Sequence, residues 1–210
     1  MALASVLGAS ASAALLYSNA WDGGDTAFAS QNDTTGGGYG NYATTFAGFN
    51  VGGPVTINEV SWVGMFFNNP VHGNITGFTL NFYSDNAGSV GSLLSTQHFN
   101  GNASETSLGN SPLGFPVYGY DQNVAGVAIS GAGWVSIVAD LAFPPQWGLA
   151  SGVNTGPLGY QTFFGSTNQL GNSVNVKIYG DRAVPEPASM TVLGLGVAAL
   201  ARKRRAAKRA

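Results

Sequence analysis

The sequence predicts an all-β fold for residues 14–182, a two-sheet antiparallel sandwich of the jelly-roll-like or immunoglobulin-like kind. Apolar and polar residues alternate in short runs, of which Phe78 to Tyr83 is the clearest. Glycine, with 31 copies, and asparagine accept positive φ at little cost and separate these runs. No amphipathic helix is evident before residue 184, so about eight to ten short strands are expected.

Charge is sparse and unevenly placed along the chain. Residues 1–181 hold nine acids and one base, Lys177, for a net charge of −8, whereas Arg182 to Ala210 holds seven bases and one acid, for +6. A domain with a single lysine cannot neutralise phosphates, so nucleic acid is not an expected partner. Because cysteine is absent, disulfides and thiolate metal sites are excluded.

Residues 1–13 are predicted to be a truncated signal peptide. They are small and apolar, and Ala11-Ser12-Ala13 offers an A-x-A-like cleavage site. The basic segment that normally opens a signal peptide is not found in them. An ordinary apolar first strand or helix is the alternative, and export is the favoured interpretation.

The first half of the domain is predicted to contain one short strand and a glycine-rich loop between Leu15 and Gly40, followed by stronger strand signals from Thr44 to Phe67. The apolar positions change parity near Asn58-Glu59, which indicates a bulge there or a turn between two strands. Residues 75–86 and 93–99 are predicted to form a hairpin around the turn at 85–88.

In the second half, a polar loop is expected at residues 100–111, and strands are expected near 115–120, 125–130 and 134–143. Pro144-Pro145 should end the last of these, because proline cannot donate to a ladder. Two shorter strands are expected near 160–164 and 174–179.

Candidates for chemistry in the domain are few, and neither an enzyme nor a metal or cofactor site is expected. His72 and His98 lack metal-ligand spacing, and most carboxylates fall in predicted turns. Asp85 and Asn86 could contribute to a calcium site, but turn chemistry explains them more simply.

Tryptophan is the main candidate for ligand binding. Trp62 and Trp134 lie within predicted strands and are expected in the core. Trp147 follows the Pro-Pro pair and is the predicted surface residue, and therefore the candidate glycan contact. Trp21 and eight tyrosines are further aromatic side chains.

The C-terminal segment, residues 183–210, reads as a membrane signal. After Pro185 and Pro187, which favour a helix start, residues 188–201 are uncharged and predict a single hydrophobic helix. A basic cluster follows and predicts a membrane stop with the β domain outside. Its members are Arg202, Lys203, Arg204 and Arg205.

The order of Val184-Pro185-Glu186-Pro187, apolar helix and basic cluster resembles the PEP-CTERM sorting signal, a segment also labelled "ice-binding protein C-terminal domain". The resemblance implies export by the general secretion machinery and transient anchoring in the inner membrane. It further implies processing by an exosortase, a membrane transpeptidase, at or near the motif, and then a cell-surface or extracellular location.

The body of the chain also resembles a loose group of PEP-CTERM β proteins that accompany exopolysaccharide production. The similar segments are residues 29–33, 60–64, 78–85, 134–137 and 147–148. We therefore expect a non-enzymatic component of the exopolysaccharide or biofilm matrix. The alternatives are a carbohydrate-binding module that uses exposed aromatics and, less favoured, an extracellular hydrolase.

Overall fold

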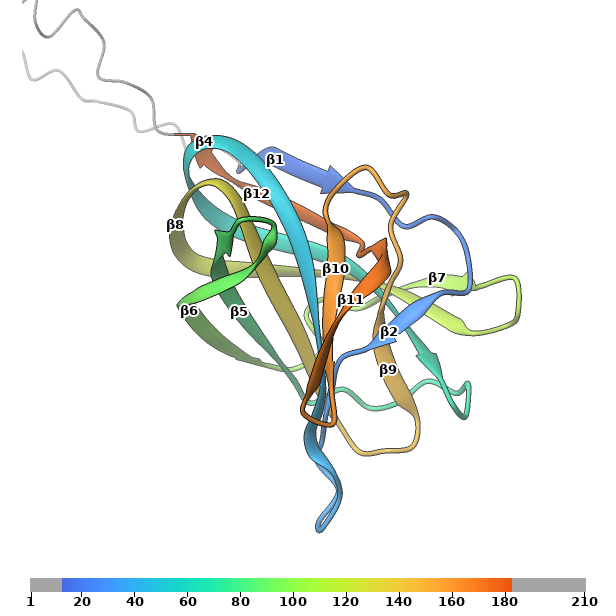
Figure 1. Cartoon of the computed structure of the whole chain (residues 1–210). Helices are drawn as coiled ribbons and strands as arrows, with labels where there is room; N and C mark the ends of the chain where they lie inside the picture. The colour runs from blue at the N-terminus through green and yellow to red at the C-terminus, as the bar shows by residue number, and fades with distance from the viewer. Residues whose placement is uncertain (1–12, 183–210) are drawn as a thin grey trace, which may run out of the picture.

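The computed structural model describes residues 13–182, and these form strands without a helix, as predicted (Figure 1). The twelve strands are β1 (Ala14–Asn19), β2 (Ala27–Ala29), β3 (Gln31–Asp33), β4 (Gly40–Phe67), β5 (Gly77–Asn86), β6 (Ser89–Asn100), β7 (Thr106–Asn110), β8 (Pro116–Leu141), β9 (Gln146–Ala150), β10 (Leu158–Phe163), β11 (Ser166–Ser173) and β12 (Val176–Arg182).

Two separate sheets are not confirmed, because the pairing links all twelve strands into one sheet. Its main path runs β1-β12-β4-β3-β8-β5-β6, and β4 also pairs directly with β8. These two strands are long enough to pass through most of the molecule, and the sheet curls on itself around the core (Figure 1). The described strands are therefore joined by continuous backbone pairing rather than divided into two separately paired sheets.

The long strands bend together at glycines. Gly52 and Gly131 both have positive φ, 84° and 75°, and lie between the paired residues Asn50–Ala132 and Pro54–Ser130. The expected break at residues 52–54 is thus a bend with a register shift rather than the end of a strand. The strands expected at 115–120, 125–130 and 134–143 are likewise one strand, β8, because the chain bends at Gly131 without leaving the sheet.

The predicted bulge near Asn58 is confirmed. The register of β4 shifts between Ile57 and Glu59 against β8, and it shifts at the same place against β12, between Tyr179 and Gly180. Because β4 has one extra residue here relative to β12, Ile57 before the bulge and Val60 after it are both fully buried.

The predicted hairpin is also confirmed as β5–β6, and β8 ends before the two prolines. Four short strands were not predicted as such: β2, β3, β7 and β9. Strand β11, which returns from β10, was not predicted either. These strands carry weak alternation. Strands β3, β7 and β9 pair with the long strands β4 or β8, whereas β2 pairs with β9 and β11 pairs with β10.

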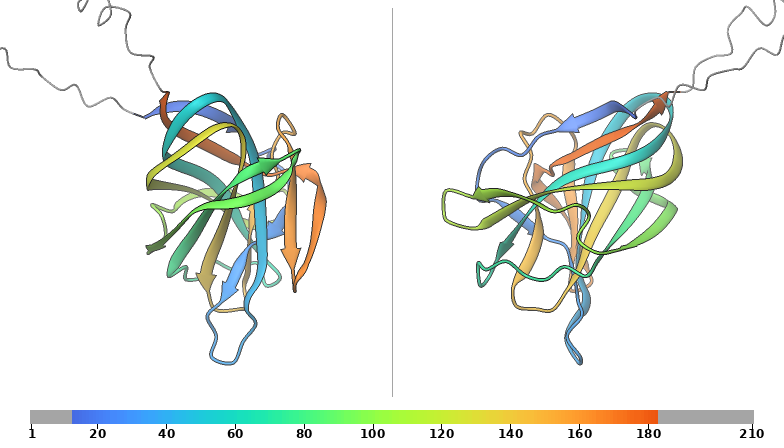
Figure 2. Two further views of the ribbon diagram at one scale, coloured as in Figure 1. Left: turned by 60° about the vertical axis from the view of Figure 1, so that its left-hand side comes forward. Right: turned by 180° about the vertical axis from the view of Figure 1, so that it is seen from behind.

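The ends of the described chain lie together. Ala14 on β1 pairs with Gly180 on β12, and both lie at one end of the molecule. The β3–β4 and β8–β9 connections and the β10–β11 turn lie at the opposite end (Figure 2). We call this the distal end.

The predicted signal peptide at 1–13 lies almost entirely outside the described residues, and the predicted C-terminal helix does so fully. Within residues 13–182, no helix has the length and apolar character needed to cross a membrane.

Candidate functional site

The prediction that Trp147 lies on the surface is wrong. Its side chain is completely buried, because β9 pairs on one side with β2 and on the other with β4. The missing side chain of Gly64 makes room for the indole, since a Cβ there would lie 2.3 Å from Trp147 Cζ2. Trp147 Nε1 donates to Tyr120 Oη at 3.1 Å. This residue is a core element and is unavailable as a surface glycan contact.

Trp62 and Trp134 are buried, as predicted. Trp134 Nε1 donates to Asp85 Oδ1 at 2.9 Å, and Gly88 N donates to Asp85 Oδ2 at 3.0 Å. The Asp85 carboxylate therefore holds a turn and a core indole, which supports the turn interpretation. Across residues 13–182, no group of three or more histidine or acidic side chains could hold a metal ion.

A hydrogen-bonded chain connects the surface to the core. His72 Nε2 lies 2.7 Å from Glu105 Oε1, and the Tyr120 hydroxyl donates to Glu105 Oε2 at 2.9 Å. Burial, followed by the nearby Glu105 carboxylate, raises the pKa of Tyr120, so this phenol stays protonated and donates. The chain ends at the indole of Trp147, where it satisfies buried polar groups.

Exposed aromatics gather instead at the distal end. We define the distal aromatic cluster as Tyr39, Tyr42, Phe143, Phe163 and Phe164. Tyr39 and Phe164 lie 5.5 Å apart at 88°, and Phe163 and Phe164 lie 4.9 Å apart at 89°. Tyr39, Phe164 and Phe163 are 60%, 59% and 41% exposed, whereas Tyr42 is buried beneath them. Three connections that are distant in sequence thus build one apolar surface.

Asp33 at the end of β3 holds the loop that carries Tyr39. Its carboxylate accepts the backbone N–H groups of Thr35, Tyr39 and Phe143 at 2.9–3.0 Å. Burial alone would raise the pKa of Asp33, but the hydrogen bonds from these residues lower it to about 2. One ionised side chain thereby fixes two members of the cluster.

Phe164 occupies an unusual backbone position. It has a φ of 44° and is followed by Gly165 at 82°, and these two residues form the β10–β11 turn. Such turns favour Asn-Gly, because a Cβ is strained at positive φ. Phe164 N donates to Tyr42 O at 2.8 Å, which ties the turn to β4. A strained backbone position therefore carries a large exposed ring at the tip of a hairpin.

The signal that could have found this cluster was Phe163-Phe164-Gly165, two aromatics before a turn glycine between polar runs. Tyr39 carries no such signal, because only the fold brings the glycine-rich loop beside that turn.

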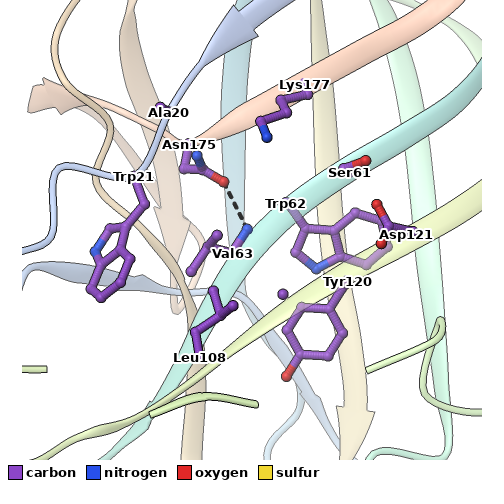
Figure 3. A pocket seen from close by; sticks show the side chains of 11 residues that line it. Ala20, Trp21, Ser61, Trp62, Val63, Leu108, Tyr120, Asp121, Asn175 and Lys177 are labelled. Carbon is purple, nitrogen blue, oxygen red and sulfur yellow. Dashed lines mark hydrogen bonds between the residues drawn. The ribbon is translucent and has the colours of Figure 1, made fainter. Parts of the chain in front are cut away.

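A cavity of about 300 Å³ is lined by residues from the last part of β4, Ser61 to Val63, whereas the distal end adjoins the start of this strand (Figure 3). It opens where β12 and β9 diverge along β4, between the pairs Ser61–Lys177 and Gly64–Leu149. Asn175 bridges the divergence, since Val63 N donates to its Oδ1 at 2.7 Å and its Nδ2 donates to Asn19 O at 2.8 Å.

The cavity wall mixes apolar and polar side chains. Trp21, Val63 and Leu108 are its main apolar members, and Ser61, Asp121 and Lys177 are its main polar members (Figure 3). Gly119 leaves the floor open because it has no side chain.

The predicted sorting residues, Val184 to Pro187, and the basic cluster, Arg202 to Arg205, lie outside the described residues. Comparison with known families matches residues 183–205 to the PEP-CTERM protein-sorting motif. Comparison with curated proteins gives no match. Directly after β12, this chain therefore carries a PEP-CTERM protein-sorting motif, which implies an exported, exosortase-sorted extracellular protein with C-terminal membrane anchoring.

Proposed function

We propose that this protein is a non-enzymatic component of the exopolysaccharide matrix, and that it holds polysaccharide through the distal aromatic cluster. The observation that carries the proposal is the exposure of Tyr39, Phe163 and Phe164 at the distal end, opposite the end of the molecule at which β12 stops at Arg182. Aromatic faces bind the apolar faces of sugar rings, and a soluble monomer rarely exposes several large aromatics together without a use.

The geometry of anchoring supports this role. Arg182, the last described residue, directly precedes the sorting motif, and β12 reaches it at the end remote from the cluster. A molecule held by its C-terminal segment would therefore present the cluster away from the membrane, towards the matrix.

The surroundings of the cluster also suit a glycan. Hydroxyl and amide groups adjoin it on the same strands: Thr162 Oγ1 lies 2.7 Å from Thr167 Oγ1, and Thr44 Oγ1 donates to Asn41 Oδ1 at 3.3 Å. Polar groups at the rim of an aromatic patch can hydrogen-bond sugar hydroxyls. The non-enzymatic part of the proposal is supported by Asp33, Asp85 and Glu105, whose carboxylates are engaged in structural hydrogen bonds.

Retention on exopolysaccharide from cells that produce the protein tests the proposal. The native protein should be retained, and Tyr39→Ala and Phe164→Asn should each weaken retention about three- to tenfold, because each removes one stacking ring. Leu93→Ala on β6 is the matched control, since Leu93 is a comparably exposed apolar residue outside the cluster. Native protein that is not retained, or variants that bind like the native protein, would overturn the proposal.

A further inference from the structure

We infer that the cavity beside Trp21 is a second binding site, and that it takes a hydroxylated carboxylate of monosaccharide size, such as a uronic acid. This site lies apart from the distal aromatic cluster and shares no residue with it. The inference therefore stands independently of the proposed function.

Three polar side chains lie in one row across the strands that border the cavity. Ser61 on β4 pairs with Lys177 on β12 and with Asp121 on β8. Residues directly opposite in antiparallel strands project from the same face, so the three side chains line the cavity side by side. Trp62, the next residue of β4, projects into the core instead and stacks on Tyr120.

The cavity wall holds hydrogen-bond donors that have no acceptor in the described part of the chain. The Ser61 hydroxyl and the indole N–H group of Trp21 are buried, and neither has a hydrogen-bond partner within residues 13–182. In the same part of the chain, no carboxylate lies within 4.0 Å of Lys177 Nζ. Buried polar groups without partners are rare in native proteins, so each of these donors calls for an acceptor from outside the chain, which a ligand in the cavity would supply.

The unpaired donors of the cavity wall determine which chemical groups a ligand must supply. Ammonium and indole N–H groups can only donate, so the ligand must supply acceptors, and a carboxylate is an acceptor-only group that also neutralises Lys177. The apolar surfaces of Trp21, Val63 and Leu108 suit the carbon face of a sugar ring. A cavity of about 300 Å³ accommodates one such ring.

Asp121 limits the orientation of the ligand. Its side chain is exposed and lies on the opposite side of Ser61 from Lys177. A bound carboxylate should therefore lie towards β12, with the ligand hydroxyls towards Asp121, which can accept from them. Lys177 and Asp121 should consequently have opposite effects on an anionic ligand.

Isothermal titration of the full chain with glucuronate and with glucose tests the inference. We expect glucuronate to bind at least about tenfold tighter than glucose, because an ion pair in a partly buried cavity exceeds about 1.4 kcal/mol. Lys177→Met should abolish this preference and Lys177→Arg should preserve most of it. Asp121→Asn should tighten glucuronate binding by about two- to fivefold, through loss of repulsion.

Fluorescence supplies a second readout, because Trp62, Trp134 and Trp147 are buried and Trp21 is half-buried at the cavity. Glucuronate should change the emission of the native protein and not that of Trp21→Phe. Oligomeric glucuronate, compared with the monomer, distinguishes a polymer unit from a free sugar acid. Equal affinity for glucuronate and glucose, absence of binding, or unchanged binding in Lys177→Met would overturn the inference.

Discussion

Asp33 shows how one side chain connects local charge to the candidate binding surface. Its ionised carboxylate accepts hydrogen bonds from three backbone N–H groups, including those of Tyr39 and Phe143 in the distal aromatic cluster. Hydrogen bonds to a charged acceptor stabilise more than neutral ones. The position of the exposed Tyr39 ring therefore depends on the ionisation of a residue beneath it.

We expect Asp33→Asn to destabilise the protein by about 1–3 kcal/mol near neutral pH, because an amide nitrogen would face backbone donors. The folded pKa of about 2 lies below the unfolded value of about 3.8. The native contribution should therefore be complete above about pH 4 and lost as the pH falls towards about 2. Urea unfolding of both proteins across this range measures it. A deficit that stays constant at all pH values would contradict the role of the charge.

Phe164 is the residue at which the local backbone preference and the proposed binding role disagree. Phe164→Asn creates Asn-Gly, the preferred pair for this turn, and removes the strain of a bulky residue at positive φ. It also removes ring contacts with Tyr42 and Phe163. Because these effects oppose each other, we expect the free energy of unfolding to change by less than about 1 kcal/mol.

The measurement is urea unfolding of Phe164→Asn alongside the polysaccharide assay. Retained stability together with weakened binding would show that the ring is kept for binding. A loss of several kcal/mol would instead make Phe164 a structural residue of the turn.

At the scale of elements, β4 and β8 are the central strands: β3, β5, β7, β9, β10 and β12 pair with one or both of them. They run past both the distal end and the cavity, and their neighbours change along their length. Where β12 gives way to β9 beside β4, the cavity opens. Where β9 docks, Trp147 is buried against Gly64.

Alanine substitution at two glycines, one on β4 and one on the stretch of β8 that pairs with it, should change the free energy of unfolding by different amounts. Gly64→Ala should lower the free energy of unfolding by about 1–3 kcal/mol or more, because the added Cβ would lie only 2.3 Å from Cζ2 of the Trp147 indole. Gly119→Ala is the matched control on β8, since its Cβ would meet only Leu108 at 3.6 Å. The urea midpoints of both variants measure the difference, and equal midpoints would show that β9 can shift to accommodate the methyl group.

At the scale of the whole molecule, the paired ends of β1 and β12 lie opposite the proposed binding surface. The sorting motif follows β12 at one end, and the distal aromatic cluster lies at the other. Changes in the motif should therefore alter location without altering the fold or polysaccharide retention.

We expect Glu186→Ala with Pro187→Ala to leave the protein in the membrane fraction with its C-terminus intact, because the sorting motif is lost. The native protein should be recovered outside the cell without residues 188–210. Cell fractionation followed by intact-mass measurement of the 21.5-kDa chain and its products checks both outcomes. Asp181→Asn, just before the motif, is the control and should be processed normally. Residues 188–210 persisting in the extracellular protein would contradict this account.

The sequence by itself was sufficient for the all-β class, the bulge near Asn58, the β5–β6 hairpin and the sorting motif. It did not predict that pairing joins all twelve strands into one sheet. Each of the features that it did predict depends on residues that are close in the chain. Alternation, a parity change and turn residues act through local backbone geometry, and the motif is contiguous. Local patterns also placed Trp62 and Trp134 in the core, because both lie within regular strands.

Only the tertiary structure decided which aromatic residues are exposed. Trp147 follows two prolines and suggests a loop, yet pairing between β2 and β4 and the space above Gly64 bury it. Tyr39 and Phe164 are 125 residues apart in sequence (positions 39 and 164). Their rings meet because both residues adjoin the start of β4. The row of Lys177, Ser61 and Asp121 likewise requires three strands in register. Long-range pairing sets these neighbours, and no local pattern encodes it.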